Sequence, residues 1–547
     1  MFKKISIISA CLVFFCFNAG LAQHNHAHHQ TPVEVDADAL GKIDFPITGG
    51  LGVQKQFERG LALLHHMMYV MADKEFTALA KAKPNCAMAH WGVAIAIFHP
   101  LWSMKPSPEK MERGEAAIRK AQSITGISER ERDFINAASE LYHDWQNVDY
   151  NTRIAAWEQA QKKLHEKYPE DVDAAAFYAL AQLATAPKSD QTFSHQKSAG
   201  ALLDKLFAKR PEHPGVLHYT IHAYDNPMLA ERAVPASRAY DKIAPDVPHA
   251  LHMPTHIFVR LGIWPDAISW NIRSAKAALK YPAKDAISLH YPHALDYLTY
   301  GYLQRGEDAN AKATLKKLFE NENYQYSTAT GYALAAIPAR YALERKQWTD
   351  AAKLEVLNWN NFPWEKYSEF ASITWFAKGL GAARSGDIAT AQTSANELKS
   401  IHGDLKEGGE NYWAVLTAAQ KQTVEAWIAF AKNEKRQAVE MMREAADLED
   451  SVDKHPVTPG AVLPARELLG DMLVLLNQPK QAIEAYEDAL KISPNRLNSL
   501  TGAARAAELA GKKKLAKSYY EKVLAVAPDS DRESKELKRA RKFLTAR

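Results

Sequence analysis

Pairs of prolines recur along this chain at an interval of 34 residues, and this interval limits the folds that the chain can adopt. Pro494 and Pro528 form one such pair, and Pro211 and Pro245 form another. A fixed period of about 20–50 residues is typical of arrays in which one supersecondary unit is stacked on the next. Because proline ends a helix, each period is predicted to hold helices that finish at the proline.

Small and aromatic residues stand at constant distances before these prolines, with small residues at offsets 24 and 12 and an aromatic residue at offset 8. In the C-terminal part of the chain these positions hold Gly470, Ala482 and Tyr486, and then Ala504, Ala516 and Tyr520. This pattern resembles the tetratricopeptide repeat, most specifically over 466–533, well over 53–100 and 199–280, and loosely elsewhere. The resemblance implies an all-α superhelical solenoid of helix-turn-helix repeats, each about 34 residues long and imperfect in the middle.

The chain is expected to consist of six successive segments. Between residues 301 and 450 the repeat pattern is degenerate. Amphipathic stretches at 309–319, 333–343 and 423–448 indicate helices there, but the sequence does not fix their register. The segments are a signal peptide at 1–22, a His-rich tail and linker at 23–50, repeats with most of the histidines at 51–300, degenerate helical repeats at 301–450, a Pro-rich loop at 451–464, and C-terminal repeats with a capping helix at 465–547.

The N-terminus has the layout of a bacterial signal peptide. Lys3 and Lys4 precede a mainly apolar run at 5–18, and the small residues Gly20 and Ala22 follow it. We therefore expect a periplasmic or secreted protein. The short segment before Cys11 resembles a lipoprotein processing site and is the less favoured alternative. No segment is long and apolar enough for a membrane span, and the formal charge of +4 gives no argument for a nucleic-acid partner.

Four histidines follow the interval of the prolines. His218 and His222 are four residues apart, and His252 and His256 repeat that spacing 34 residues later. Residues four apart lie on one face of a helix, about 5–6 Å apart at Cβ. Each pair is thus predicted to point two imidazoles in one direction. The resemblance to tetratricopeptide repeats implies that these first-helix positions line the concave groove.

Two such pairs on neighbouring helices form a nitrogen-rich set of metal ligands. Asp225 lies seven residues after His218 and is expected on the same face, as a fifth ligand or as an acceptor for a ring N–H. The sequence therefore predicts one metal site formed by His218, His222, His252, His256 and Asp225. Nitrogen ligands favour a transition metal such as Zn²⁺, Cu²⁺ or Fe²⁺ over Ca²⁺ and Mg²⁺. Structural polar packing and contacts to an organic ligand are the alternatives.

His290 and His293 are spaced three apart on the next first-helix segment, with Asp296 nearby, and would extend this site or form a second one. His65, His66, His90 and His99 would join the site only if the solenoid closes on itself. His455 would join it only if the Pro-rich loop folds over the groove.

Three functions fit these observations. The first is an exported repeat protein that binds a transition metal in its groove. The second is a metal-dependent enzyme that uses the same site, with Asp225 as base or orienting group. The third is a scaffold without metal that binds a peptide or a partner protein. A small molecule is a further candidate for the ligand of the groove. The chain has no Cys-x-x-Cys-His sequence, phosphate loop or nucleophile elbow, so whether it is an enzyme stays undecided.

Overall fold

The computed structural model describes residues 39–545 except for 103, 104, 188, 189, 191, 322, 358, 360, 361 and 533. The predicted signal peptide and the His-rich tail up to residue 38 lie outside the described residues. All described residues belong to one unit of the chain, Val35–Arg547.

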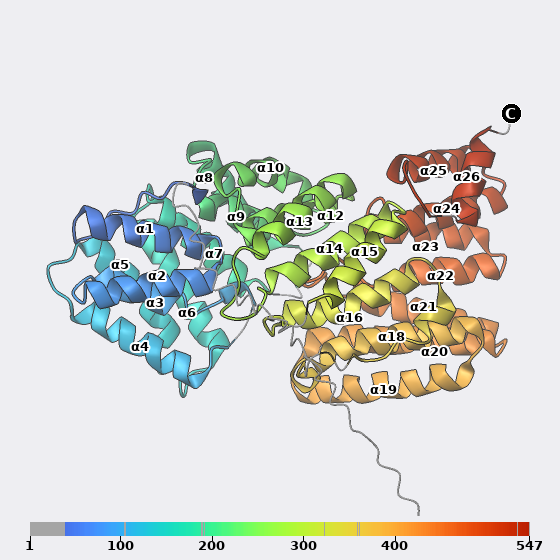
Figure 1. Cartoon of the computed structure of the whole chain (residues 1–547), viewed down its shortest axis with the longest axis horizontal. Helices are drawn as coiled ribbons and strands as arrows, with labels where there is room; N and C mark the ends of the chain where they lie inside the picture. The colour runs from blue at the N-terminus through green and yellow to red at the C-terminus, as the bar shows by residue number, and fades with distance from the viewer. Residues whose placement is uncertain are drawn as a thin grey trace, which may run out of the picture. The chain divides into compact units, whose positions relative to one another are not determined.

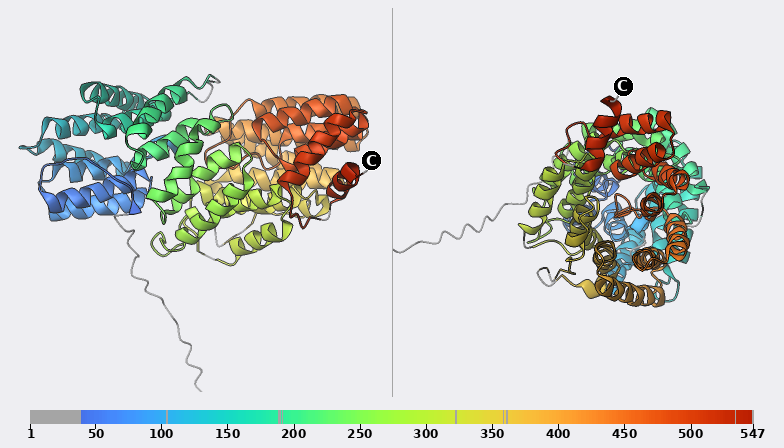
Figure 2. Two further views of the ribbon diagram at one scale, coloured as in Figure 1. Left: turned by 90° about the horizontal axis from the view of Figure 1, so that it is seen from above. Right: turned by 90° about the vertical axis from the view of Figure 1, so that its right-hand side faces the viewer.

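Helices follow one another along this unit, and each α-helix packs against the next one in the sequence (Figures 1 and 2). The N-terminal helices are α1 (Leu51–His65), α2 (Tyr69–Ala82), α3 (Ala87–Ile95), η2 (Pro100–Trp102), α4 (Pro108–Ser123), α5 (Glu129–Ser139), η3 (Glu140–Tyr142), α6 (Tyr150–Lys167), α7 (Val172–Thr185) and α8 (Ser194–Lys209). Packing between sequence neighbours is the defining property of a solenoid.

The middle of the chain continues the array. Its helices are α9 (Pro214–Tyr224), η4 (Ala230–Ala233), α10 (Val234–Ile243), α11 (Pro248–His252), α12 (Pro254–Arg260), α13 (Trp264–Ala278), α14 (His290–Gln304), α15 (Asp308–Phe319), α16 (Thr328–Leu343), α17 (Trp348–Ala351) and η5 (Trp364–Lys366). Several helices here also contact the second helix after them, as α10 contacts α12, α14 contacts α16 and α16 contacts α18. These contacts stack one helical pair on the next.

The C-terminal helices complete the array. They are α18 (Ser368–Ser385), α19 (Ile388–Glu407), α20 (Asn411–Ala431), α21 (Lys435–Asp450), α22 (Ala465–Leu475), α23 (Pro479–Ile492), α24 (Leu497–Leu509), α25 (Lys513–Val526) and α26 (Lys535–Thr545). The predicted stretch 423–448 is two helices, because the chain turns at Asn433, whose φ is +68°. No β-strand occurs among the described residues, and no helix among them is long and apolar enough to cross a bilayer.

The aromatic residue of the repeat pattern packs between a glycine of the helix before its own and a glycine of the helix after it. A Cβ atom added at Gly470 would lie 2.7 Å from the ring of Tyr486, and one added at Gly502 would lie 2.2 Å from it. The same relation holds near the N-terminus, where Phe76 packs against Gly92. Close helix packing around a shared ring thus explains why small residues and aromatic residues keep constant offsets, and the predicted all-α solenoid is confirmed.

Candidate metal centre

The second histidine pair lies on either side of a break between two short helices. His252 is the last residue of α11 and His256 is in the first turn of α12. Pro254 has no N–H, so the helical hydrogen bonding is interrupted between them. The two Nε2 atoms nevertheless lie only 3.0 Å apart. Two nitrogens bound to one ion at about 2.0–2.1 Å would be separated by about 3–3.5 Å, so this distance fits a shared ligand shell.

Hydrogen bonds on the far side of each ring determine which nitrogen holds the proton. His256 donates from Nδ1 to Asp225 Oδ2 over 2.9 Å, and His252 donates from Nδ1 to Asn271 Oδ1 over 2.8 Å. Asn271 is oriented for this role, since its amide N–H₂ donates to Ala267 O. In the neutral form of both rings, the two Nε2 lone pairs therefore face each other.

A third imidazole completes this group. His293 comes from α14, and its ligand nitrogen and those of His252 and His256 all lie within 4.8 Å of one another. All three side chains are buried. Burial lowers the pKa of each ring, and neighbouring histidines lower the pKa of His252 and His293 further. The three rings are thus neutral near pH 7 and available as metal ligands. We call this group the 252 triad.

Asp225 lies behind His256, on the side of Nδ1. It also accepts hydrogen bonds from Arg260 and Lys454, each at 2.9 Å. Burial alone would raise the pKa of Asp225, but Lys454, Arg260 and His256 hold it well below its usual range. A carboxylate fixed in this way orients a ring and keeps its tautomer. Asp225 therefore occupies the second of the two positions considered from the sequence, that of a hydrogen-bond acceptor for a ligand.

The first histidine pair forms a separate group with a residue of the next repeat. Nε2 of His218 and Nε2 of His222 are 3.2 Å apart, and a nitrogen of His249 lies within 4.8 Å of both. His218 donates from Nδ1 to the carbonyl oxygen of His65 over 2.7 Å. Helix α9 approaches α1 closely enough for this bond because residue 215 is glycine, where a Cβ would lie 2.4 Å from the His65 ring. We call this group the 218 triad.

The four predicted histidines are thus arranged as two pairs, and each pair is joined by one more histidine. The pair of one repeat is completed by a ring from the next repeat, His249 for the 218 triad and His293 for the 252 triad. The sequence analysis did not select His249. The sequence feature that could have identified His249 is its position three residues before His252, in a short helix that begins at a proline.

His65 belongs to a different kind of polar group, which also contains Asp173 and His213. His65 donates from Nε2 to Asp173 Oδ1 over 2.8 Å and accepts a hydrogen bond at Nδ1 from the Tyr219 hydroxyl over 3.0 Å. His213 donates from Nε2 to the same carboxylate oxygen over 3.3 Å and accepts at Nδ1 from the backbone N–H of Val216. Each ring nitrogen has a partner of the required type. We call this the Asp173 group.

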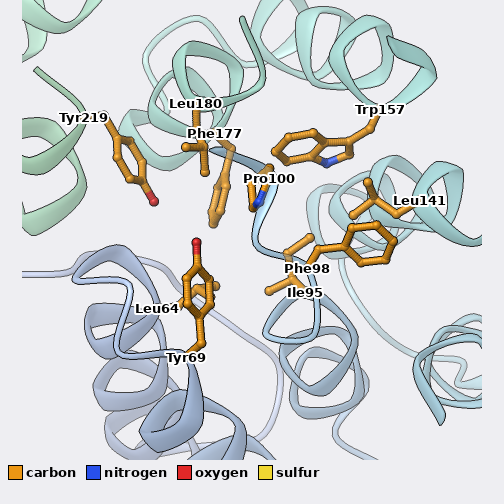
Figure 3. A pocket seen from close by; sticks show the side chains of 10 residues that line it. All are labelled: Leu64, Tyr69, Ile95, Phe98, Pro100, Leu141, Trp157, Phe177, Leu180 and Tyr219. Atoms are coloured by element: carbon orange, nitrogen blue, oxygen red, sulfur yellow. The ribbon is translucent and has the colours of Figure 1, made fainter. Parts of the chain in front are cut away.

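A small cavity lies next to the Asp173 group. The Tyr219 and Tyr69 side chains point into it from two sides, while Phe177 and other apolar side chains form most of its wall (Figure 3). Its volume is about 20 Å³, which is room for about one water molecule. A cavity of this size and lining is too small for an organic substrate.

The remaining histidines contact the protein itself. His66 is buried and bonded to Tyr240 and to Leu40 O, His90 is bonded to Pro84 O, and the ring of His99 stacks on Tyr69. His290 is close to the 218 triad, since its ring centroid lies 5.3 Å from that of His249.

The Pro-rich loop at 451–464 covers the face that holds the 252 triad. Arg260 makes two hydrogen bonds to the carboxylate of Asp453, each at 2.7 Å, and Lys454 bonds to Asp225. Tyr297, whose ring packs against His252 and His256, donates to Thr458 O. The loop therefore covers part of this face.

Further along the loop, hydrogen bonds to backbone carbonyls hold it in place. Arg340 donates to Gly460 O and Ala461 O at 2.7 and 2.8 Å. The ring of His455 packs at a tilt against those of Tyr412 and Trp413.

A family profile agrees with the C-terminal part of this architecture. The profile of the tetratricopeptide repeat matches residues 463–496 and 497–530, which contain α22–α23 and α24–α25. The chain therefore contains tetratricopeptide repeats in this part. Among solved structures it is similar to one titled "Crystal structure of APC/C hetero-tetramer Cut9-Hcn1", at 14% sequence identity and a TM-score of 0.29, with 90% of each chain covered. No curated protein matches the sequence.

Proposed function

We propose that this repeat protein binds a transition-metal ion through His252, His256 and His293. The observation that carries the proposal is the 3.0 Å approach of two Nε2 atoms whose rings both donate from Nδ1. Two lone pairs at this distance repel each other unless a cation lies between them. A metal ion removes the repulsion and uses both lone pairs as ligands.

A proton is the other cation that would satisfy this pair. A proton between the rings would make one of them an imidazolium, donating from both nitrogens. Burial opposes this charge, and the pKa of both His252 and His256 lies below the usual value. At neutral pH a metal ion is therefore the better partner, and the all-nitrogen ligand set favours Zn²⁺, Cu²⁺ or Fe²⁺.

A metal-dependent enzyme is a second candidate function, because the triad supplies three protein ligands and not four. Catalytic metal sites keep one position for water or substrate, whereas structural zinc sites use four protein ligands. Asp225 would orient His256 in such an enzyme, since its low pKa makes it a weak base. Binding of azide to the Co²⁺-loaded protein, followed by absorption spectroscopy, would detect an exchangeable position, and an unchanged spectrum would argue against this candidate.

The scaffold without metal has less support at this part of the groove. The loop at 451–464 already makes backbone hydrogen bonds there, through Thr458, Gly460 and Ala461. A peptide would have to displace these contacts before it reached the helices.

Metal analysis of the full chain tests the proposal. The protein is purified without a His-tag, stripped with a chelator, exposed to Zn²⁺, Cu²⁺ or Fe²⁺ under anaerobic conditions, desalted and analysed by mass spectrometry of the metal. We expect retention of the ion by the unmodified protein and its loss from the 252 triad in His252→Ala and His256→Ala. His143→Ala removes an exposed imidazole and serves as the matched control.

Less than about 0.2 metal ion per chain after these exposures would reject metal binding. Retention unchanged in both triad variants, with helicity intact by circular dichroism, would reject this set of ligands. Because all variants share the His-rich tail at 23–50, metal held by the tail does not affect the differences between them.

Export is part of the same proposal. The layout of residues 1–22 supports it, and sequencing of the N-terminus of the mature protein from the periplasmic fraction tests it. A start near residue 23 is expected, and an intact Met1 would contradict it.

A further inference from the structure

His249 is a buried side chain whose two ring nitrogens both lack a hydrogen-bond partner among the described residues. Only 6% of the residue is exposed. A neutral imidazole has one N–H donor and one lone pair, and burial of both without partners is unfavourable. Buried polar groups are otherwise almost always satisfied. This position therefore indicates a partner that the protein chain does not supply.

The rings of His218 and His222 indicate what this partner is. His218 donates from Nδ1 to His65 O, so its Nε2 presents a lone pair toward Nε2 of His222 at 3.2 Å. The ring centroid of His249 lies 5.0 Å from that of His218. One ligand nitrogen from each of the three rings falls within a common 4.8 Å. As in the 252 triad, a pair of histidines four residues apart is joined by one further ring, although His249 and His293 do not stand at equivalent positions of their repeats.

We propose that His218, His222 and His249 hold a second transition-metal ion, so that the protein binds two ions at matching places in successive repeats. This inference goes beyond the proposed function, because it rests on other residues and on the unsatisfied nitrogens of His249. Three imidazoles suit Zn²⁺, Cu²⁺ or Co²⁺, as they do in the 252 triad.

The partial exposure of His222 provides a route for the ion. His218 and His249 are buried, whereas the side chain of His222 is only partly covered. An ion arriving from solvent would meet His222 first and then the two inner rings.

An ordinary explanation exists for part of this geometry. His222 can donate from Nε2 to His218, and a water molecule can satisfy His249. This alternative predicts that the second triad holds no metal and that only the 252 triad retains one. The two explanations therefore differ in the number of ions per chain.

Stoichiometry measured with Zn²⁺ alone distinguishes them. The full-length protein is stripped, loaded with excess Zn²⁺, desalted and analysed beside His249→Gln, His249→Leu, His293→Ala and the double variant His249→Gln/His293→Ala. We expect the unmodified protein and the control His143→Ala to hold two more ions than the double variant, and each single variant to hold one more ion than the double variant.

The outcomes separate this inference from the proposed function. Suppose that the unmodified protein holds one ion, and that both His249 variants keep it whereas His293→Ala loses it. This result overturns the second site and leaves the proposed function intact. One ion that is lost in the His249 variants and kept in His293→Ala supports the second site and rejects the 252 triad. One ion that is lost in all variants means that the rings share a single ion, and it overturns the second site.

Two His249 variants guard against a failure to fold. Leucine removes every polar atom, whereas glutamine keeps a donor and an acceptor. Loss of an ion counts only where the stripped variant keeps the helicity of the unmodified protein by circular dichroism. If only one of the two folds, that variant decides.

Discussion

The Asp173 group and the 252 triad are both buried clusters with two or more histidines, yet their nitrogen atoms are satisfied in opposite ways. In the Asp173 group, His65 and His213 donate to one carboxylate and accept from a hydroxyl and a backbone N–H. In the 252 triad, His252 and His256 donate outward and present lone pairs to each other. The difference lies in the carboxylate that accepts both N–H groups of the Asp173 group, and therefore in the positions of the protons, and not in burial.

This comparison shows how a structural histidine cluster is distinguished from a candidate metal site. Ligand atoms close to one another do not suffice, since the Asp173 group also brings three of them within 4.8 Å. A group with complete donor and acceptor pairing needs no ion. A group in which hydrogen bonds on the outer side turn lone pairs toward one another is a candidate site for a cation.

The largest effect on stability is expected in the Asp173 group. Asp173→Ala would leave the N–H groups of His65 and His213 buried without an acceptor, and we expect a loss of about 3–5 kcal/mol in the free energy of unfolding. Urea denaturation measures this loss, and the Zn²⁺ content of the folded variant should not change. A lowered Zn²⁺ content would show that the Asp173 group also holds metal and would break the comparison.

Acid should destabilise the stripped protein through buried histidines outside the triads. Burial lowers the pKa of His66 from 6.5 to about 3, so the unfolded chain takes up a proton that the folded chain refuses. The stability contributed by neutral His66 is complete above pH 6.5 and is lost as the pH falls toward 3. At pH 5 the loss is about 2 kcal/mol for such a residue. Thermal melting between pH 7 and 5 measures it, and a melting temperature independent of pH would contradict it.

Asp225→Asn should weaken metal binding about 10–100-fold, because the neutral amide orients His256 less strongly. Competition with a chromophoric chelator measures the affinity. The control is Asp241→Asn. Asp241 also pairs with an arginine, the half-exposed Arg273, and its replacement should leave the affinity for the metal unchanged. Equal affinities for Asp225→Asn and the unmodified protein would remove the role assigned to this carboxylate.

The loop at 451–464 should slow the exchange of metal at the 252 triad. Asp453→Asn breaks the paired hydrogen bonds to Arg260, and since Asp453 is partly exposed we expect release to a chelator to accelerate only about 2–5-fold. Stopped-flow absorption measures the release. Asp447→Asn disrupts the exposed ion pair with Arg466 near the start of the loop and is the control. Equal release rates for both variants would show that the loop does not cover the route of the ion.

The smallest effect on stability concerns the 218 triad without metal. His249→Leu removes two unsatisfied nitrogens from the interior, and the stripped variant should be more stable than the stripped unmodified protein by about 1 kcal/mol. With Zn²⁺ present the order should reverse. If the stripped variant is the less stable of the two, His249 has a partner that supports the fold without metal.

The 34-residue interval was sufficient to predict the solenoid. The offsets between prolines, small residues and aromatic residues reflect a direct contact, the packing of rings such as Tyr486 against glycines of two helices. The middle of the chain was harder, because the amphipathic pattern at 423–448 runs through the turn at Asn433 without a break.

The sequence identified the two histidine pairs, named His293 only as a candidate to extend the site, and did not select His249. Spacing within one helix is visible in the chain, whereas His293 follows the segment between α13 and α14 that shifts the 34-residue register. The ion pair between Lys454 and Asp225 joins residues 229 positions apart, and no periodicity predicts such a contact. The tautomers of His252 and His256 are fixed by hydrogen bonds to Asn271 and Asp225 on the outer sides of the two rings. Only the packed structure shows that these side chains reach the rings.

Anomalous diffraction from crystals of the Zn²⁺-loaded protein tests the central claim most directly. We expect an anomalous peak at the 252 triad, about 2.0–2.1 Å from Nε2 of His252 and of His256, and no peak at the Asp173 group. A peak at Asp173, or no peak between His252 and His256 at full Zn²⁺ loading, would contradict the account.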